Sequence, residues 1–129
     1  MFFADRFFGY DDAVYASLRL LEIVASAGRP LHQLLSDVPT TYSTPELRVD
    51  CPDDVKFGLV QRVLDHYRST HSVIDVDGAR IQFDGGWGLV RASNTQPVLV
   101  LRFEAGSEQR LAQIRSEVEA TVERLGGTI

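Results

Sequence analysis

The sequence predicts an α+β fold in which an antiparallel sheet carries two helices on one face. From residue 46 onward, period-two and helical apolar patterns follow one another in the order strand, helix, four strands, helix. The pair Asp77-Gly78 lies between two β-prone runs and is a strong local signal for a hairpin. The two helices carry apolar stripes that need a common surface. A sheet with both helices on one face buries these stripes most economically.

The first 42 residues predict a different kind of unit, separated from the sheet by an extended connector. Four phenylalanines among the first eight residues indicate a strand that another element covers. Asp11-Asp12 starts a helix that ends at Gly28, and its apolar residues are spread widely enough for burial on more than one side. A short helical piece is expected over residues 31–36. The connector covers residues 40–45, where β-branched and small polar residues precede a proline.

The second unit is expected to begin with a half-buried strand over residues 46–51. Charged and apolar residues alternate strictly there, so Cys51 is better explained as a small buried residue than as a nucleophile. Pro52 then starts a helix with an apolar stripe. The residues of that stripe are Phe57, Val60, Val63, Leu64 and Tyr67.

Two hairpins and a final helix complete the predicted unit. A two-residue turn at Asp77-Gly78 sets opposite charges across from each other and aliphatic residues together. Its expected pairs are Val76 with Ala79, Asp75 with Arg80 and Ile74 with Ile81. The second hairpin covers residues 87–104. The last helix is capped by Ser107 and ends at Gly126-Gly127.

The second hairpin contains a small polar loop that is the main candidate site. Arg91 supplies a planar fork of donors at its near end, and Pro97 can close it where the next strand begins. Ser93, Asn94 and Thr95 add short side-chain donors and closely spaced backbone N–H groups. This inventory suits an anion with several oxygens, such as phosphate. A hydrogen-bonded turn without a ligand explains the same residues equally well on local chemistry.

Composition limits the possible partners. The formal net charge is −5, and the sequence has no block of Lys or Arg that would favour nucleic acid or an anionic membrane. No apolar run approaches the roughly 20 residues that span a bilayer, and the first residues do not look like a signal peptide. A single cysteine fits a reducing compartment and cannot build a cysteine-based metal site. A cytoplasmic protein is therefore expected.

Other polar residues favour structural roles. The aspartate pairs at 11–12, 53–54 and 75–77 lie at predicted helix starts or beside a hairpin turn. The three histidines, His32, His66 and His71, have no metal-ligand spacing, so no metal site is expected. Trp87 lies at a strand start, which favours core or hinge packing over stacking on a sugar.

The residues around the polar loop resemble a known family. Gly-Trp-Gly-Leu-Val-Arg-Ala-Ser-Asn-Thr-Gln-Pro, residues 86–97, resembles the phosphate-binding loop of the α-D-phosphohexomutases, in particular the bacterial phosphomannomutase/phosphoglucomutase branch. Residues 7–12 and 42–46 extend the resemblance over essentially the whole chain in the family's order. It implies that residues 43–129 form the C-terminal, fourth domain, with a TATA-binding-protein-like arrangement. Residues 1–42 would be the helical and strand tail of the third, α/β domain.

The resemblance also implies a function. The family enzyme is a four-domain isomerase of carbohydrate metabolism, an intramolecular phosphotransferase that interconverts mannose or glucose 1- and 6-phosphates through a phosphoserine, Mg²⁺ and a 1,6-bisphosphate intermediate. The family's serine, metal and sugar loops have no match in this chain, so we expect no catalytic residue here and no turnover by the chain alone. The expected partners are the phosphosugar and the remaining domains of the enzyme.

The residue roles follow the motif. Arg91, Ser93, Asn94 and Thr95 would hold the nonreacting phosphate during phosphoryl transfer, and a hinge at Ser43, Thr44 and Pro45 would let the fourth domain close. The alternative is a noncatalytic, stand-alone phosphate-binding or protein-interaction domain. Nucleic-acid binding, suggested only by fold analogy, is disfavoured by the acidic composition.

Overall fold

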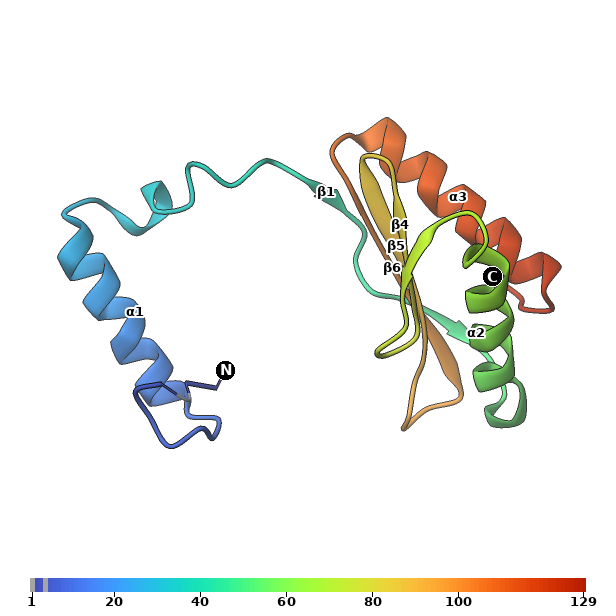
Figure 1. Ribbon diagram of the computed structural model, residues 1–129, viewed down its shortest axis with the longest axis horizontal. Helices are drawn as coiled ribbons and strands as arrows, with labels where there is room; N and C mark the ends of the chain where they lie inside the picture. Colours follow the sequence, from blue (N-terminus) through green and yellow to red (C-terminus); the bar gives the residue numbers. More distant parts are fainter. Residues whose placement is uncertain (1, 4) are drawn as a thin grey trace. The chain divides into compact units, whose positions relative to one another are not determined.

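The computed structural model describes residues 2–3 and 5–129. These residues divide into two compact units at the junction between Pro39 and Thr40. Figure 1 shows one long helix with flanking turns in the first unit, and a sheet with two helices in the second. All six strands that the structure describes belong to the second unit.

The helix of the first unit, α1, spans Ala13–Ala27 and is capped at both ends. Asp12 accepts a hydrogen bond from the backbone N–H of Tyr15 at 2.8 Å, which satisfies one of the free donors of the first turn. Gly28 ends the helix in the left-handed conformation, with φ at 62°. Both ends lie where the sequence predicts them. The following 3-10 helix η1 (Leu31–Gln33) is shorter than the helical piece predicted over residues 31–36.

The strand predicted at the aromatic start of the chain is wrong for the residues that the structure describes. They form bends and turns, with an isolated bridge between Phe2 and Asp11. Phe7 stacks on Tyr15 of α1, with ring centroids 4.1 Å apart, and Gly9 turns the backbone at a φ of 77°. The aromatic side chains pack on the neighbouring helix because the described part of this unit offers no strand to pair with. Met1 and Ala4 lie outside the described residues.

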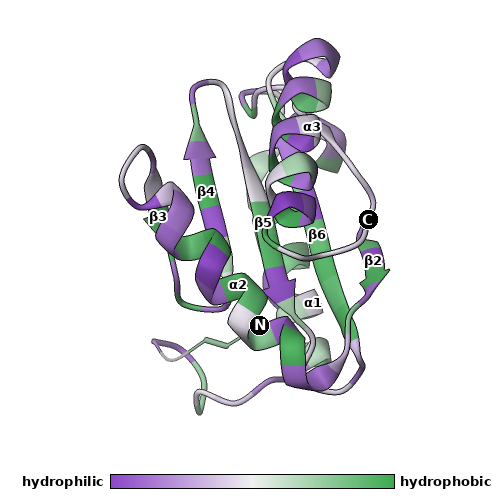
Figure 2. Cartoon of the chain, turned by 90° about the vertical axis from the view of Figure 1, so that its right-hand side faces the viewer, coloured by the Kyte–Doolittle hydropathy of each residue, from purple (hydrophilic) through white to green (hydrophobic). Residues whose placement is uncertain are grey.

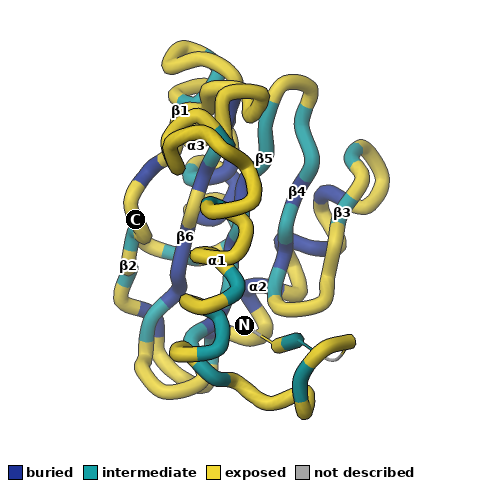
Figure 3. The backbone as a smooth tube through the Cα atoms, turned by 90° about the vertical axis from the view of Figure 1, so that its left-hand side faces the viewer, coloured by how far each residue is buried: buried dark blue, intermediate teal, exposed yellow. Residues whose placement is uncertain are grey.

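The predicted burial of α1 on more than one side is also wrong. None of its residues is buried, as Figure 3 shows by the absence of dark blue along it. Val14, Leu18 and Leu21 expose 72%, 59% and 62% of their surface. The physical reason is that no second layer covers this helix among the described residues of its unit.

The second unit is built on a six-stranded antiparallel sheet. Its strands lie in the order β1-β6-β5-β4-β3, and β2 also pairs with β6, so β1 and β2 lie along the same side of that strand. From β2 onward the order confirms the predicted strand, helix, four strands and helix, whereas β1 was not predicted. The elements are β1 (Tyr42–Ser43), β2 (Leu47–Asp50), α2 (Asp53–Tyr67), β3 (Ser72–Ile74), β4 (Ala79–Phe83), β5 (Gly86–Ala92), β6 (Val98–Ala105) and α3 (Glu108–Arg124).

Helices α2 and α3 cover the same face of the sheet, as the sequence predicts (Figure 2). Alternate residues of the central strands point to this face, and Val90 and Leu101 lie opposite each other there, both fully buried. Gly88 lets α3 approach closely, since a Cβ at this position would lie 3.2 Å from Val118 Cγ2. Tyr67 of α2 donates a hydrogen bond to the Thr121 hydroxyl of α3 at 3.1 Å, which joins the two helices.

The first hairpin differs from its predicted register by one residue. Ile74 pairs with Arg80 and Val73 with Ile81, so the loop covers residues 75–78 instead of two residues. A one-residue shift moves every side chain of a strand to the other face. It places Val73 against the core and leaves Ile74 on the opposite face. The predicted pairing of Asp75 with Arg80 is replaced by an ion pair with Arg68 at 2.7 Å.

The apolar stripe of α2 is confirmed except at its first residue. Phe57 is exposed, whereas the other four predicted residues are buried. Lys56 occupies the inward position in its place. Both ends of α3 agree with the sequence: at its start the Ser107 side chain accepts a hydrogen bond from the Arg110 N–H at 3.2 Å, and after its end Gly126 turns the chain at a φ of 100°.

Candidate anion site

The anion loop, residues 91–97, comprises the last two residues of β5 and the connection to the start of β6. Arg91 is the second-last residue of β5, and its side chain, 35% exposed, lies on the face of the sheet that carries no helix. Ser93 is half-buried, while Asn94 and Thr95 are exposed. The four predicted binding residues therefore lie together at one end of the second hairpin, with solvent access to each.

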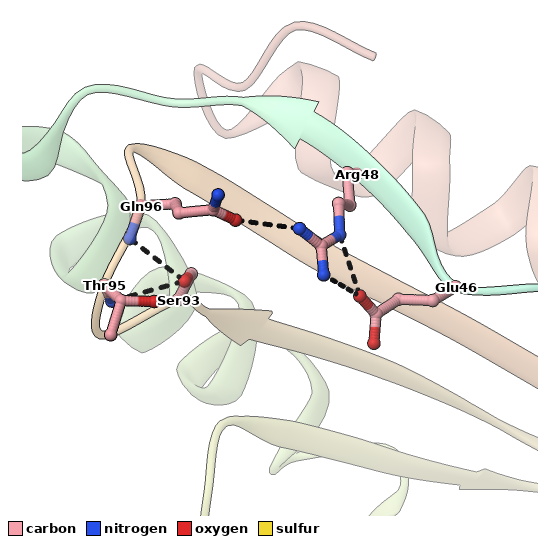
Figure 4. Close-up of polar contacts among 5 residues, drawn as sticks. All are labelled: Glu46, Arg48, Ser93, Thr95 and Gln96. Carbon is pink, nitrogen blue, oxygen red and sulfur yellow. Dashed lines mark hydrogen bonds and ion pairs between the residues drawn. The ribbon is translucent and has the colours of Figure 1, made fainter.

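Ser93 organises the loop from inside. Its hydroxyl oxygen accepts hydrogen bonds from the Thr95 N–H at 3.4 Å and from the Gln96 N–H at 3.2 Å (Figure 4). Its own N–H donates to the Val98 carbonyl at 3.0 Å. The backbone N–H groups of Ser93 and Thr95, which the sequence suggested as donors to an anion, are therefore already engaged within the turn. The Ser93 hydroxyl proton remains available to donate, and accepting two hydrogen bonds strengthens a hydroxyl as a donor.

Gln96 is held from two sides by cations that sequence reasoning missed. Arg48 of β2 donates to the Gln96 side-chain oxygen at 2.8 Å and forms an ion pair with Glu46, also at 2.8 Å (Figure 4). Lys56 of α2 donates to the Gln96 carbonyl at 2.9 Å. The Cys51 N–H donates to the neighbouring Pro97 carbonyl at 2.8 Å. The far half of the anion loop is therefore anchored to both β2 and the start of α2.

Arg91 has a carboxylate beside it. Its Nη1 lies 3.4 Å from Oδ2 of Asp77, in the loop between β3 and β4. Gly78 brings that loop close, because a Cβ there would lie 2.9 Å from the Arg91 Cα, and its φ of 92° also favours glycine. The Arg91 guanidinium is consequently paired with an exposed anion in the structure, and an added phosphate would compete with Asp77 for it.

The uncovered face of the sheet is rich in arginine around Arg91. Arg80 and Arg102 line the same shallow hollow of about 350 Å³, whose floor includes Leu89. Trp87 also lies on this face, with the Arg80 guanidinium 4.6 Å from its ring centroid. Of the two packing roles predicted for Trp87, core packing is wrong, because successive residues of β5 point to opposite faces and Trp87 points away from the helices. Hinge packing stays a prediction. The carboxylates of Glu46 and Asp77 line the same hollow, so the three arginines there are partly neutralised.

The remaining sequence candidates have structural surroundings. Burial raises the pKa of the Cys51 thiol, although the nearby Lys56 ammonium opposes the shift, so the thiol stays protonated and poorly nucleophilic near neutral pH. No cluster of His, Cys, Asp or Glu suited to a metal ion occurs in the described residues. None of the described helices is both long and apolar enough to cross a bilayer.

Two of the three predicted hinge residues, Ser43 and Thr44, are attached to the sheet. Ser43 pairs with Glu104 through β1 and β6. Thr44 is buried, its N–H donates to the Phe103 carbonyl at 3.0 Å, and its hydroxyl accepts from the Phe103 N–H at 3.2 Å. Any bending at Thr44 would have to break these two bonds.

Among the residues that support the anion loop, Lys56 has a weak signal in the sequence, and Arg48 and Asp77 have none. Lys56 is the one lysine of the chain and falls at the helical spacing of Val60, Val63 and Tyr67, so periodicity alone puts it on the buried face. No comparable local pattern points to Arg48 or Asp77, because their contacts join segments that lie far apart in the sequence.

Comparison with known proteins gives matches along both units. Residues 46–121 match the family model for the phosphoglucomutase/phosphomannomutase C-terminal domain. Residues 1–42 match the model for the phosphoglucomutase/phosphomannomutase alpha/beta/alpha domain III. The anion loop lies within the first of these matches.

Individual relatives carry related names. A phosphomannomutase/phosphoglucomutase of Pseudomonas aeruginosa is 42% identical over 117 residues, which are 90% of this chain and 25% of the relative. A phosphoglucomutase of Neisseria gonorrhoeae is 39% identical over 126 residues, covering 95% and 27%. A solved phosphoglucomutase/phosphomannomutase family protein of Burkholderia thailandensis matches with a TM-score of 0.83 at 37% identity, over 98% of this chain and 27% of that one. The chain thus spans about a quarter of the length of the relatives it matches.

Proposed function

The chain belongs to the phosphoglucomutase/phosphomannomutase family, and on that premise we propose that its anion loop holds the nonreacting phosphate of a hexose phosphate. The observation that carries the proposal is the loop itself, in which Arg91 and the Ser93 hydroxyl lie at one solvent-accessible end of the paired strands β5 and β6. A site on packed strands holds its donors in place before the ligand arrives, which reduces the cost of binding.

The roles of the donors differ in our proposal. Arg91 forms the charge-assisted contact, because a guanidinium can give two parallel hydrogen bonds to phosphate oxygens. Ser93 donates its hydroxyl proton while its oxygen keeps the turn closed. Asn94 and Thr95 are exposed at the tip and complete the cradle with their side chains.

The activity of the whole family enzyme enters as part of the proposal. The relatives are named phosphomannomutase and phosphoglucomutase, so the ligand that we propose is a mannose or glucose 1- or 6-phosphate, or the 1,6-bisphosphate. The described residues contain no ligand cluster that fits Mg²⁺, which the resemblance implies for the complete enzyme. We therefore assign phosphate holding to this chain and phosphoryl transfer to other parts of the family enzyme.

The division of the chain is proposed in the same terms. Residues 1–42 would be the tail of the third domain, and residues 43–129 the fourth, phosphate-binding domain. Closure of this domain over the ligand would use Ser43 to Pro45 as a hinge. Because Ser43 and Thr44 are bonded to β6, a hinge at these residues would have to release those bonds when the domain closes.

The test is a titration of the 129-residue chain with glucose 6-phosphate, followed by amide chemical shifts. We expect saturable shifts at the anion loop, and we expect glucose without phosphate to give none. Replacing Arg91 by Ala removes a charge-assisted bond and should weaken binding by about tenfold or more. The control is Arg115→Ala, since Arg115 is an exposed, ion-paired arginine on α3.

The two variants separate a local site from general charge. Equal weakening in Arg91→Ala and Arg115→Ala would show that the phosphosugar responds only to net charge. Unchanged shifts in Arg91→Ala, with the loop signals still moving, would place the phosphate on other donors and contradict the proposed role of Arg91.

A further inference from the structure

Lys56 is the one lysine among the chain's 13 basic residues, and it is almost completely buried. Only 2% of its surface is exposed, because Lys56 lies on the buried face of α2. Lysine is rarely buried in proteins unless its ammonium is paired, because removal of a charge from water is costly. A nonpolar residue of similar length would fill the same space without that cost.

The Lys56 ammonium contacts its own helix and the anion loop at the same time. Nζ lies 2.5 Å from Oδ1 of Asp53, one turn earlier in α2, and donates to the Gln96 carbonyl at 2.9 Å. The same carbonyl accepts the Val98 N–H at 2.8 Å, so both of its lone pairs are used. Lys56 thus joins a helix of the core to the backbone of an exposed loop.

Gln96 is the residue of the anion loop that is hydrogen-bonded to β2, to α2 and to the turn itself. Arg48 holds its side chain and Lys56 its carbonyl, and its N–H closes the turn on Ser93. Residues 94–97 are exposed, so these polar contacts replace packing as the source of order. Fixing the backbone of a flexible residue costs conformational entropy, and a loop that is already ordered does not lose that entropy again on binding.

We propose that Lys56 is a positioning residue of the anion loop, which fixes the Gln96 carbonyl and thereby the turn that presents Ser93 to an anion. The ligand class is the phosphate group, so the inference rests on the proposed function. Lys56 does not touch the anion in this scheme. It acts through Gln96, and its influence on affinity comes from the order that it imposes before binding.

The single lysine gives a direct measurement on the unmodified chain. Labelling with lysine that carries ¹⁵N at Nζ gives one ammonium signal, because the chain has no second lysine. We expect slow proton exchange with water, as required by a buried and hydrogen-bonded ammonium. We also expect the signal to shift on addition of inorganic phosphate, with the same concentration dependence as the amides of Ser93 and Thr95.

Two variants on the same helix provide the comparison. Lys56→Met keeps the length and removes the charge. Arg62→Met is the matched control, because Arg62 is also a cation of α2 that donates to a backbone carbonyl, that of Leu125 at 3.2 Å, outside the anion loop. Lys56→Met should weaken inorganic phosphate binding by about tenfold relative to the control and speed amide exchange at Thr95 and Gln96. Lys56→Arg, which keeps charge and donors, should restore part of both.

The outcomes distinguish this inference from the proposed function. If the unmodified chain binds no phosphate, the proposed function fails, and faster amide exchange at Thr95 and Gln96 in Lys56→Met would still support the positioning role. Equal affinity and equal exchange in Lys56→Met and Arg62→Met would overturn it. If Lys56→Met does not fold, the labelled ammonium decides: rapid exchange with water, or no shift at saturating phosphate, contradicts the inference.

Discussion

Helices α1 and α2 have the same length, 15 residues each, and very different surroundings. α1 contains more apolar residues, including Leu18, Leu20 and Leu21, and none of its residues is buried. α2 carries charged residues at its start and still buries six side chains, among them Leu59 and Val63. The difference lies in what each unit offers its helix, because α2 rests on β4 and β5, whereas the described residues of α1's own unit form no sheet.

The comparison shows that apolar composition does not by itself make a core. A helix of this length is marginal in water, and most helical stability in proteins comes from packing of one face. In the second unit that packing fixes β5 and β6, and through them the position of Arg91. In the first unit the helix rests on its own caps and on local aromatic contacts such as that of Phe7 with Tyr15.

Amide hydrogen exchange should give the largest difference between the two helices. We expect the central amides of α2, β5 and β6 to exchange only through global opening of the second unit, at a free energy of about 5 kcal/mol or more. Amides of α1 should exchange through local opening, close to the rate of an unstructured peptide. Exchange measured by NMR on the monomeric chain checks this. Protection of α1 equal to that of α2 would mean that another surface covers it.

A matched pair of leucine substitutions should give the next largest difference. Leu59 of α2 is fully buried, whereas Leu21 of α1 exposes 62% of its surface. Leu59→Ala should lower the free energy of unfolding of the second unit by about 2–5 kcal/mol, through lost burial and a cavity. Leu21→Ala should change it by less than about 0.5 kcal/mol. Urea unfolding followed by Trp87 fluorescence reports on the second unit, and similar losses in both variants would contradict the contrast.

Alkaline pH should lower the free energy of unfolding of the second unit, and the buried Tyr67 should be one cause. Burial raises the pKa of Tyr67 above its ordinary value of 10.0, despite the hydrogen bond to Thr121. Since the unfolded chain then releases the tyrosine proton first, the free energy of unfolding falls as pH rises through about 10. Tyr67→Phe should make this fall shallower. The measurement is urea unfolding across the alkaline range, and an identical slope in the variant would exclude Tyr67 as a cause.

Much of the second unit could be predicted because its local signals agree with one another. The alternation in β2, the helical stripe of α2 and the cap at Ser107 each specify an element without reference to the others. The register of the first hairpin could not be predicted, because the pair Asp77-Gly78 is compatible with a longer loop as well as with a two-residue turn. The fit of Val73 beside the buried Ile81 decides between them and is a tertiary contact, whereas the exposed ion pair of Asp75 with Arg68 adds little stability.

The candidate site likewise has a part that the sequence could predict and a part that depends on tertiary contacts. The motif around Arg91 and Ser93 is contiguous, so the sequence displays it. Its supports come from β2, from α2 and from the loop after β3, at separations of 48, 40 and 14 residues. Of these, Lys56 could have been noticed from its place on the buried stripe. Arg48 and Asp77 become visible only when strand pairing brings their segments to the anion loop.

Substitution of Asp77 should have the smallest effect on stability, because its ion pair with Arg91 is exposed and adds little to the free energy of unfolding. Its effect on phosphate binding should be specific to Arg91. Exposed ion pairs contribute about 0–1 kcal/mol, in contrast to the buried contacts of α2. The same carboxylate competes with an incoming phosphate for the guanidinium. Asp77→Asn should therefore leave the free energy of unfolding within about 0.5 kcal/mol of the original and tighten phosphate binding by up to about fivefold.

The matched control for this last prediction is Asp75→Asn. It removes the same charge from the same loop, but Asp75 pairs with Arg68 and not with Arg91. Titration with inorganic phosphate at low and high salt should show a gain for Asp77→Asn that exceeds the gain for Asp75→Asn and shrinks as salt screens the carboxylate. Equal gains would mean that only net charge matters. A loss of affinity in Asp77→Asn would mean that Asp77 orients Arg91 for the phosphate, so that its carboxylate assists binding and does not compete.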